Sequence, residues 1–429
     1  MSKVIFFNLP GASGHINPTV GLVKELISRG EHVIYYAGED SRLKFTGLGA
    51  EFRTYEQWFD YQHNAEIGSS LLPMAIEELK MTMSSIDGLI AQAKEDEVDY
   101  IIYDSCCPWG KYVAASIGVP AINSITTIVS SPWILLCDLK MGLFVLKTLL
   151  VGAPRVIPWA RRQLIDMLVR INVPYQGILF HIFDFFASVG DKNIVFNTRE
   201  YQPFDDKLVG DFEFVGASIP ERRDDIEDEF KDLEGKPLVY VSLGTLHNSD
   251  IAFYRNCIQA FRYTSYEVIM SVGRNINIPD LGDLPDNIKV YPFVPQLHIL
   301  KYAKAFVTHG GMNSLNEGLY FGVPVIVCPQ QFEQAFNGRR LQKLGIARTL
   351  QTNRPLPVDI FKAVSDVIED EAMSKKVKEY SELMKKSGGY RRAADIIMDY
   401  VGSENIHNSG DAFLEDQPSN PKVPSSASS

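Results

Sequence analysis

The sequence predicts an α/β protein with two domains, each built around a parallel β-sheet. The chain has 429 residues, which is long enough for two domains of about 200 residues each. Short apolar segments rich in Val and Ile alternate along it with segments whose apolar residues recur at helical spacing. A charge-rich segment, 218–236, separates two such series. We therefore expect one domain over residues 1–217 and a second over residues 237–402.

The first half alternates strand and helix signals from its beginning. Strands are expected at KVIFFNLP, HVIYYAG, DYIIYDS and PAINSI, and helices at INPTVGLVKELISRG and PWGKYVAASIG. Gly30 follows the first of these helices, where helices commonly stop. Strands joined through helices form right-handed βαβ units and a parallel sheet. Such sheets bind ligands beyond the carboxyl ends of their strands.

The second half repeats this order after the linker. Strands are expected at PLVYVSLGT, YEVIMSVG, IKVYPFV, AFVTHGG and PVIVCP, with helices at AFYRNCIQAFRY, QLHILKYAK, SLNEGLYFG and NGRRLQKLG. The last helix of this domain could pack back on the first domain. Residues 403–429 are polar and rich in Ser and Pro, which predicts a disordered tail.

Composition excludes several classes of protein. A net charge of −11 argues against a nucleic-acid partner, because phosphate backbones require a basic face. Five cysteines at irregular spacing form neither a disulfide framework nor a zinc pattern, and Cys106 and Cys107 are interpreted as small buried hydrophobes. The sequence lacks a signal-peptide layout and a run of 18 apolar residues. We expect a cytoplasmic protein without stable membrane insertion.

The segment FVTHGGMNSLNEGLYFGVPVIVCP, residues 306–329, predicts an anion site. Gly310 and Gly311 allow a tight turn between a strand and a helix, so the backbone can approach a ligand closely. The helix expected to begin near Asn313 offers free N–H groups and the positive end of its dipole. Ser314 and His309 add side-chain donors. A phosphate or diphosphate would fit this turn.

A carboxylate one turn further along narrows the choice of ligand. Glu317 repels phosphate but can accept hydrogen bonds from two vicinal hydroxyls, as on a ribose. A second turn of hydroxyls and glycine, VSLGT, places Ser242 and Thr245 where they could face the same anion. Together these features indicate a nucleoside diphosphate. The alternative is that Asn313 and Ser314 only cap the helix and Glu317 completes that cap.

In the first half, the segment GASGHINPT predicts a general base. A dinucleotide site is the alternative, but Gly-x-Gly-x-x-Gly is not met because Ser13 and His15 break its register. A His at the opening of a Gly-rich turn suits general-base catalysis, because it titrates near neutral pH. Asp104 ends a predicted strand at the same sheet edge and could orient the imidazole. The alternatives are a structural His at a helix start and an ordinary turn residue.

Three segments together resemble the nucleotide-sugar signature of the family 1 UDP-glycosyltransferases. They are FVPQLHIL from residue 293, THGGMNSLNEGLYFGVPVIVCP from residue 308, and QQFEQ from residue 330. With GHINPT, the resemblance extends from the first helix to about Gly345, and it is strongest to the bacterial group that glycosylates macrolides and flavonoids. It implies the GT-B fold, in which two Rossmann-like domains face each other across a cleft.

The resemblance also assigns roles to individual residues. It implies that His15 is the catalytic base and Asp104 its partner. For the UDP-sugar it implies uracil stacking on Phe293, base contact through the backbone of Val294, ribose binding by Gln296 and Glu317, diphosphate binding by His309, Gly311, Asn313, Ser314, Thr245 and Ser242, and sugar recognition by Glu333 and Gln334. Glu333 and Gln334 favour glucose as the sugar.

The expected activity is inverting transfer of a sugar, preferably glucose, from a UDP-sugar to a hydroxyl of a hydrophobic acceptor. The acceptor would be a flavonoid, another phenolic or a macrolide, bound against the aromatic and Leu-rich segments 130–159 and 173–190. No metal is expected, because the chain has no Asp-x-Asp pair. Three alternatives remain: a membrane-surface glycolipid or sterol glucosyltransferase, a UDP-sugar epimerase, and a non-catalytic UDP-sugar-binding partner.

Overall fold

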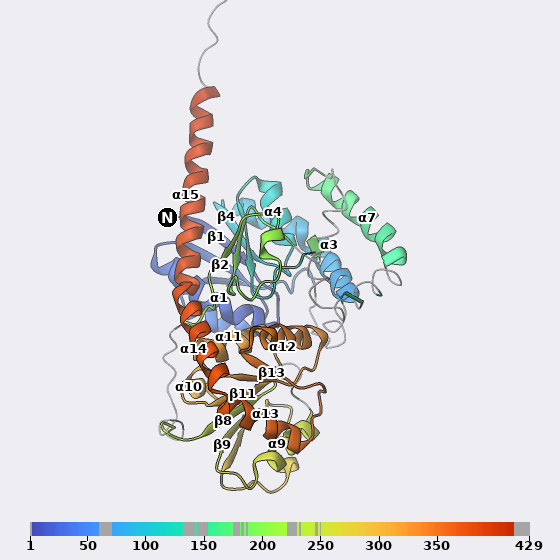
Figure 1. Ribbon diagram of the computed structural model, residues 1–429. Helices are drawn as coiled ribbons and strands as arrows, with labels where there is room; N and C mark the ends of the chain where they lie inside the picture. Colours follow the sequence, from blue (N-terminus) through green and yellow to red (C-terminus); the bar gives the residue numbers. More distant parts are fainter. Residues whose placement is uncertain are drawn as a thin grey trace, which may run out of the picture.

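The computed structural model describes residues 2–59, 71–131, 142–143, 147, 153–174, 181, 184–185, 188–220, 230, 233–244, 248 and 250–415. Two α/β domains lie one above the other, and helices α14 (Glu371–Lys386) and α15 (Gly389–Glu415) run along one side of both (Figure 1). Among the described residues, no helix is long and apolar enough to cross a membrane.

The N-terminal domain is built on a seven-stranded parallel sheet with the strand order β3-β2-β1-β4-β5-β6-β7. Its strands are β1 (Lys3–Phe7), β2 (His32–Tyr36), β3 (Glu51–Arg53), β4 (Tyr100–Asp104), β5 (Ala121–Ile125), β6 (Lys192–Val195) and β7 (Phe212–Phe214). The chain order reverses at β1, which lies between β2 and β4. Ligand sites of open parallel sheets form beyond the carboxyl ends of strands at such a reversal.

Helices cover both faces of this sheet. They include α1 (Ser13–Ser28), α2 (Arg42–Thr46), α3 (Leu71–Glu95), α4 (Trp109–Ile117) and α7 (Ala153–Arg170). Successive strand side chains point to opposite faces, so Ile5 and Phe7 belong to the core under α3, α4 and α7, whereas Val4 and Phe6 belong to the core under α1. The core therefore consists of two apolar layers that hold β1 and β4 rigidly at the point of reversal.

The C-terminal domain repeats this plan with a six-stranded parallel sheet in the order β10-β9-β8-β11-β12-β13. Its strands are β8 (Leu238–Ser242), β9 (Glu267–Ser271), β10 (Ile288–Tyr291), β11 (Ala305–Thr308), β12 (Val325–Val327) and β13 (Ala347–Thr349). Its helices include α9 (Ile251–Phe261), α10 (Gln296–Leu300), α11 (Met312–Tyr320), α12 (Phe332–Leu344) and α13 (Pro357–Glu369). Helices α11 and α12 face the N-terminal domain (Figure 1). The two parallel sheets confirm the predicted fold class.

The last helix crosses to the first domain. Ala393, Ala394, Ile397 and Val401 of α15 are buried in the same apolar layer as α1, and Asp395 forms an ion pair with Arg29 at 2.5 Å. Helix α15 continues to Glu415, whereas the sequence predicts a disordered tail from residue 403. Residues 403–415 contain no proline that would stop the helix. The expected linker, 218–236, lies largely outside the described residues, as do residues 416–429.

Candidate active site

The centre of the N-terminal site is a His–carboxylate pair. His15 lies in the first turn of α1, directly after β1, and Asp104 is the last residue of β4, the neighbouring strand. His15 Nδ1 lies 3.0 Å from both carboxylate oxygens of Asp104. An ionised carboxylate only accepts hydrogen bonds, so Nδ1 carries the proton and Nε2 is the basic nitrogen. The two expected catalytic residues are therefore brought together across the point of strand reversal.

The environment holds both partners in place. Asp104 is fully buried and accepts a further hydrogen bond of 2.9 Å from the backbone N–H of Cys106, while Thr126 Oγ1 lies 3.3 Å from His15 Nδ1. Burial by itself would lower the pKa of His15, but the Asp104 carboxylate and, more weakly, Glu333 outweigh it and raise the pKa above the usual 6.5. Because Glu333 belongs to the C-terminal domain, carboxylates from both domains raise the pKa of His15.

Cys106 is closer to the catalytic pair than the sequence suggested. It is partly exposed, unlike the buried Cys107, and its sulfur, a His15 nitrogen and an Asp104 oxygen all lie within 4.8 Å of one another. These are ligand types that a transition metal accepts. Burial, followed by the charge of Asp104, raises the pKa of the Cys106 thiol well above 9, so the thiol is protonated at neutral pH. The cluster thus places a neutral thiol beside the His15–Asp104 pair.

A buried acid on α3 lies near the same pair, and sequence reasoning missed it. Glu78 is 4% exposed, and burial, followed by the charge of Asp104, raises its pKa well above 4.5. Its surroundings therefore favour the protonated form of this carboxyl. Its neighbours at helical spacing, Ala75 and Thr82, are also buried, so Glu78 lies on the buried face of α3.

On the opposite side of the site, the turn after β11 leads into α11. Gly310 adopts φ +91°, a conformation that favours glycine, and Gly311 is the N-cap of α11 with no side-chain cap. The alternative in which Asn313 and Ser314 cap this helix is therefore wrong, because both lie inside it and the first turn begins at Met312. The uncapped end leaves N–H groups for an anion.

The residues expected around the ribose form one hydrogen-bonded group. Asn313 Nδ2 donates to Glu317 Oε1 at 3.0 Å, and Gln296 Nε2 donates to the other oxygen of the same carboxylate. Tyr240 Oη donates to Gln296 Oε1 at 3.0 Å. Glu317 is buried, and these donors orient it. Asn313, which the resemblance assigns to the diphosphate, is here bonded to the carboxylate that the resemblance assigns to the ribose.

The other expected donor residues lie around this group. Phe293 is 75% exposed, so its ring is open to stacking, whereas the Val294 side chain is buried and leaves only its backbone for contact. Ser242 accepts a hydrogen bond of 3.3 Å from the backbone of Gly244. A Cβ on Gly244 would lie 2.6 Å from His309 Cε1, so the turn after β8 packs against His309. Thr245 lies outside the described residues.

Glu333 and Gln334 stand at the start of α12 but differ in exposure. Gln334 is buried, and its Oε1 accepts from the backbone N–H groups of Gln330 and Gln331 at 2.8 and 3.0 Å. It completes a capping box with Gln331, which orients its amide. Glu333 is exposed on the side facing His15. The acceptor segments 130–159 and 173–190 lie largely outside the described residues.

Comparisons with known proteins agree with this arrangement. Residues 257–387 match the family model "Erythromycin biosynthesis protein CIII-like, C-terminal domain". The chain is 32% identical over 405 residues to "Uncharacterized UDP-glucosyltransferase YojK" of Bacillus subtilis, covering 94% of this chain and 98% of the relative. It is 31% identical over 412 residues to "NDP-glycosyltransferase YjiC" of Bacillus licheniformis, covering 94% and 98%.

A solved structure supports the same assignment. The crystal structure of the glycosyltransferase of kitacinnamycin superimposes with a TM-score of 0.78 at 26% identity, over 93% of this chain and 98% of that one. Fold and sequence thus agree. The chain belongs to the family 1 UDP-glycosyltransferases and is a glycosyltransferase with the GT-B fold.

Proposed function

We propose that this enzyme transfers glucose from UDP-glucose to a hydroxyl of a hydrophobic small molecule, with inversion at the anomeric carbon. The observation that carries this proposal is the His15–Asp104 pair, whose basic nitrogen belongs to one domain while Glu333 and the uncapped end of α11 belong to the other. A base on one side and an anion site on the other are the two requirements of direct displacement at a sugar phosphate ester.

The proposed reaction is a single displacement. His15 Nε2 removes the proton of the acceptor hydroxyl while its oxygen forms a bond to C1 of the sugar. The bond from C1 to the UDP oxygen breaks on the opposite face, so an α-linked donor gives a β-glycoside. Asp104 stabilises the imidazolium, and general-base catalysis of this kind contributes about 10²–10⁴ in rate.

The leaving group is held by the C-terminal domain. The N–H groups at the start of α11, with Ser314, His309 and Ser242, receive the diphosphate charge. Glu317, fixed by Asn313 and Gln296, receives the ribose hydroxyls, and the open ring of Phe293 stacks on uracil. We propose that these donors replace a divalent cation, so the rate is expected to be unchanged by EDTA.

The sugar and the acceptor are inferred from two different sources. The relative named as a UDP-glucosyltransferase supports glucose, and the adjacent Glu333 and Gln334 offer acceptors and donors for sugar hydroxyls. Similarity to an erythromycin-biosynthesis domain and to the kitacinnamycin enzyme supports a bulky natural product as the acceptor. We propose flavonoids, other phenolics and macrolides as the acceptor classes.

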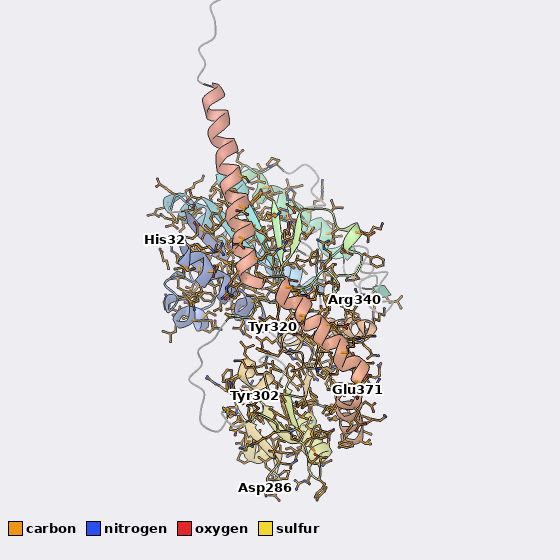
Figure 2. All side chains as sticks on the ribbon, turned by 60° about the vertical axis from the view of Figure 1, so that its left-hand side comes forward. His32, Asp286, Tyr302, Tyr320, Arg340 and Glu371 are labelled. Carbon is orange, nitrogen blue, oxygen red and sulfur yellow. The ribbon has the colours of Figure 1, made fainter. Side chains whose placement is uncertain are left out.

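The test is product detection by mass spectrometry with UDP-glucose and a panel of phenolic, macrolide and sterol acceptors. Wild type is expected to form glucosides, and His15→Ala to lose product by at least about 10²-fold while still binding UDP. His32→Ala is the matched control, since His32 is partly exposed at the outer edge of the N-terminal domain and pairs with Glu51 (Figure 2).

Each outcome separates the alternatives. Product from His15→Ala at the rate of wild type would refute the assigned base. UDP bound by wild type with no product from any acceptor would favour a binding partner, and UDP released without an acceptor would favour an epimerase. Transfer restricted to sterols or lipids would move the acceptor class to the membrane surface.

A further inference from the structure

One buried amide, Asn337 on α12, touches the two parts of the donor site that must act together. Its Nδ2 donates to the backbone oxygen of Gly310 at 3.1 Å and lies 3.5 Å from Glu333 Oε1. Both partners only accept hydrogen bonds, which fixes the orientation of the amide. Asn337 is fully buried. Asn337 thus contacts both the turn at Gly310, which is proposed to receive the diphosphate, and the exposed carboxylate of Glu333.

The oxygen of this amide is held from the other domain. Tyr201 lies in the loop between β6 and β7 of the N-terminal domain, and its hydroxyl donates to Asn337 Oδ1 at 2.7 Å. Tyr201 is 1% exposed, so water does not replace this donor. Arg340, labelled at the junction of the domains in Figure 2, donates from Nε to the backbone oxygen of Tyr201 at 2.8 Å. The loop is therefore fixed to α12 through side chain and backbone.

The next residue ties the same loop to the catalytic base. Gln202 is buried and bonds both backbone groups of Val129, donating to its oxygen at 3.1 Å and accepting from its N–H at 3.0 Å. Val129 follows Thr126, whose hydroxyl lies 3.3 Å from His15 Nδ1. Tyr201 and Gln202 thus connect the surroundings of the base with the turn that receives the leaving group.

We propose that Tyr201 is a positioning residue that acts through Asn337. Its hydroxyl holds the diphosphate turn at Gly310 and the carboxylate of Glu333 in register with His15 across the gap between the domains. The proposal rests on the proposed UDP-sugar site. It assigns no chemistry to Tyr201, because the hydroxyl is fully buried against the amide and does not face the reacting atoms.

The structure supplies a matched control. Tyr380 on α14 is also a buried tyrosine whose hydroxyl bonds across the domains, to Thr198 Oγ1 at 2.7 Å. Thr198 Oγ1 also accepts from the backbone N–H of Tyr201 at 3.3 Å, but it is not bonded to Asn337 or Gly310 in any described contact. Tyr201→Phe and Tyr380→Phe therefore each remove one buried interdomain hydroxyl from the same loop, and only the first removes a hydrogen bond to Asn337.

The experiment is calorimetric titration of wild type, Tyr201→Phe and Tyr380→Phe with UDP, followed by kinetics with UDP-glucose. Tyr201→Phe is expected to weaken UDP binding and raise KM for the donor by about three- to tenfold, the effect of one lost hydrogen bond. KM for the acceptor is expected to stay unchanged. The two variants are expected to lower Tm by similar amounts. Tyr380→Phe is expected to leave UDP affinity and donor KM unchanged.

A double-mutant cycle separates positioning from loosening of the fold. In the background of Asn337→Ala, Tyr201→Phe is expected to add nothing to the loss of UDP affinity, because its path runs through Asn337. Additive losses, equal effects of the two Tyr→Phe variants, or parallel rises in donor and acceptor KM would each overturn the proposal. Wild type that binds no UDP would overturn the proposed function instead, which keeps the two failures distinct.

Discussion

At the scale of the residue, the proposed reaction depends on whether His15 is protonated. To accept a proton, the His15 imidazole must be neutral. Because its pKa is raised, a larger fraction of His15 is protonated at a given pH than of an ordinary His. Activity is therefore expected to fall as pH drops through this raised pKa. Burial opposes the shift, so the position of the acidic limb reports how well the two carboxylates offset desolvation.

Glu333→Gln tests the cross-domain part of this balance. The substitution removes one of the charges that raise the pKa of His15, so the acidic limb of kcat/KM is expected to move to lower pH. The rate at the optimum also falls, because Glu333 is proposed to bind the sugar. Measuring pH profiles of wild type and variant, each normalised to its own maximum, isolates the shift.

Glu371→Gln serves as the control, since Glu371 is exposed at the start of α14 (Figure 2) and is not among the groups that shift the pKa of His15. It should leave the limb in place. A limb that stays in place in Glu333→Gln would show that the two domains do not approach as closely in solution as the charge of Glu333 on His15 requires.

Sequence reasoning found the residues whose type and position signal chemistry, and it missed those that act through burial. His15 and Asp104 follow strands at one sheet edge, so their proximity was predictable. Thr126 and Cys106 are ordinary residues near their turns, and only the tertiary fold brings their side chains to the pair. The raised pKa of Glu78 likewise depends on packing that no local pattern records.

At the scale of the element, the turn between β11 and α11 combines a special backbone with tight packing. Gly310→Ala would place a Cβ 2.6 Å from Val327 Cγ1 and 3.1 Å from Gln334 O, at φ +91°. The turn must then shift, so UDP affinity is expected to fall by about tenfold or more. Titration with UDP measures this directly.

Gly282→Ala separates the backbone effect from the site. Gly282 has φ +89° but nothing within 4 Å of its Cβ position, and it is exposed after the turn at Ile278–Leu281. This variant is expected to lose stability through the same strain while keeping UDP affinity. Equal UDP affinity in both variants would refute the role of the Gly310 turn.

The elements themselves were largely readable, because buried parallel strands and amphipathic helices have distinct periods. The start of α11 was expected near Asn313 and lies at Met312, within the usual uncertainty of helix ends. The capping box of α12 was not recognised, since Gln331 and Gln334 were considered only as part of the QQFEQ motif. Helix α15 continues beyond residue 403, where the sequence predicts a disordered tail, because polar composition alone does not terminate a helix.

At the scale of the whole molecule, the two domains are connected by side chains as well as by the linker. Asn316 Nδ2 donates to the backbone oxygen of Phe196 at 3.0 Å, and Ser218 donates to the backbone oxygen of Pro18. Helix α15 adds an apolar contact by packing on α1. These contacts could not be predicted, because pairs so distant in sequence leave no periodic signal.

Ile397→Ala tests how far the N-terminal domain depends on α15. Ile397 is fully buried in the layer that contains Leu22 and Leu26, so the substitution is expected to lower the free energy of unfolding by about 2–5 kcal/mol. Hydrogen exchange is expected to quicken in α1 as well as in α15. Denaturant unfolding and exchange measure the two effects.

Asp399→Ala, at an exposed position on the same helix, should change stability by no more than about 0.5 kcal/mol. Faster exchange confined to α15 in Ile397→Ala would mean that α1 is stable without it, and that the helix only rests on the first domain.

The return of α15 has a consequence for synthesis on the ribosome. Residues 393–401 cover the apolar side of α1 but are translated long after it. This side of α1 therefore stays uncovered while the second domain is being made. A nascent chain at that stage exposes the apolar surface of α1, the helix that carries His15, and chaperones bind such surfaces. Stalled chains ending at residue 388 should therefore be captured by a chaperone, and chains that present residue 401 outside the tunnel should be released.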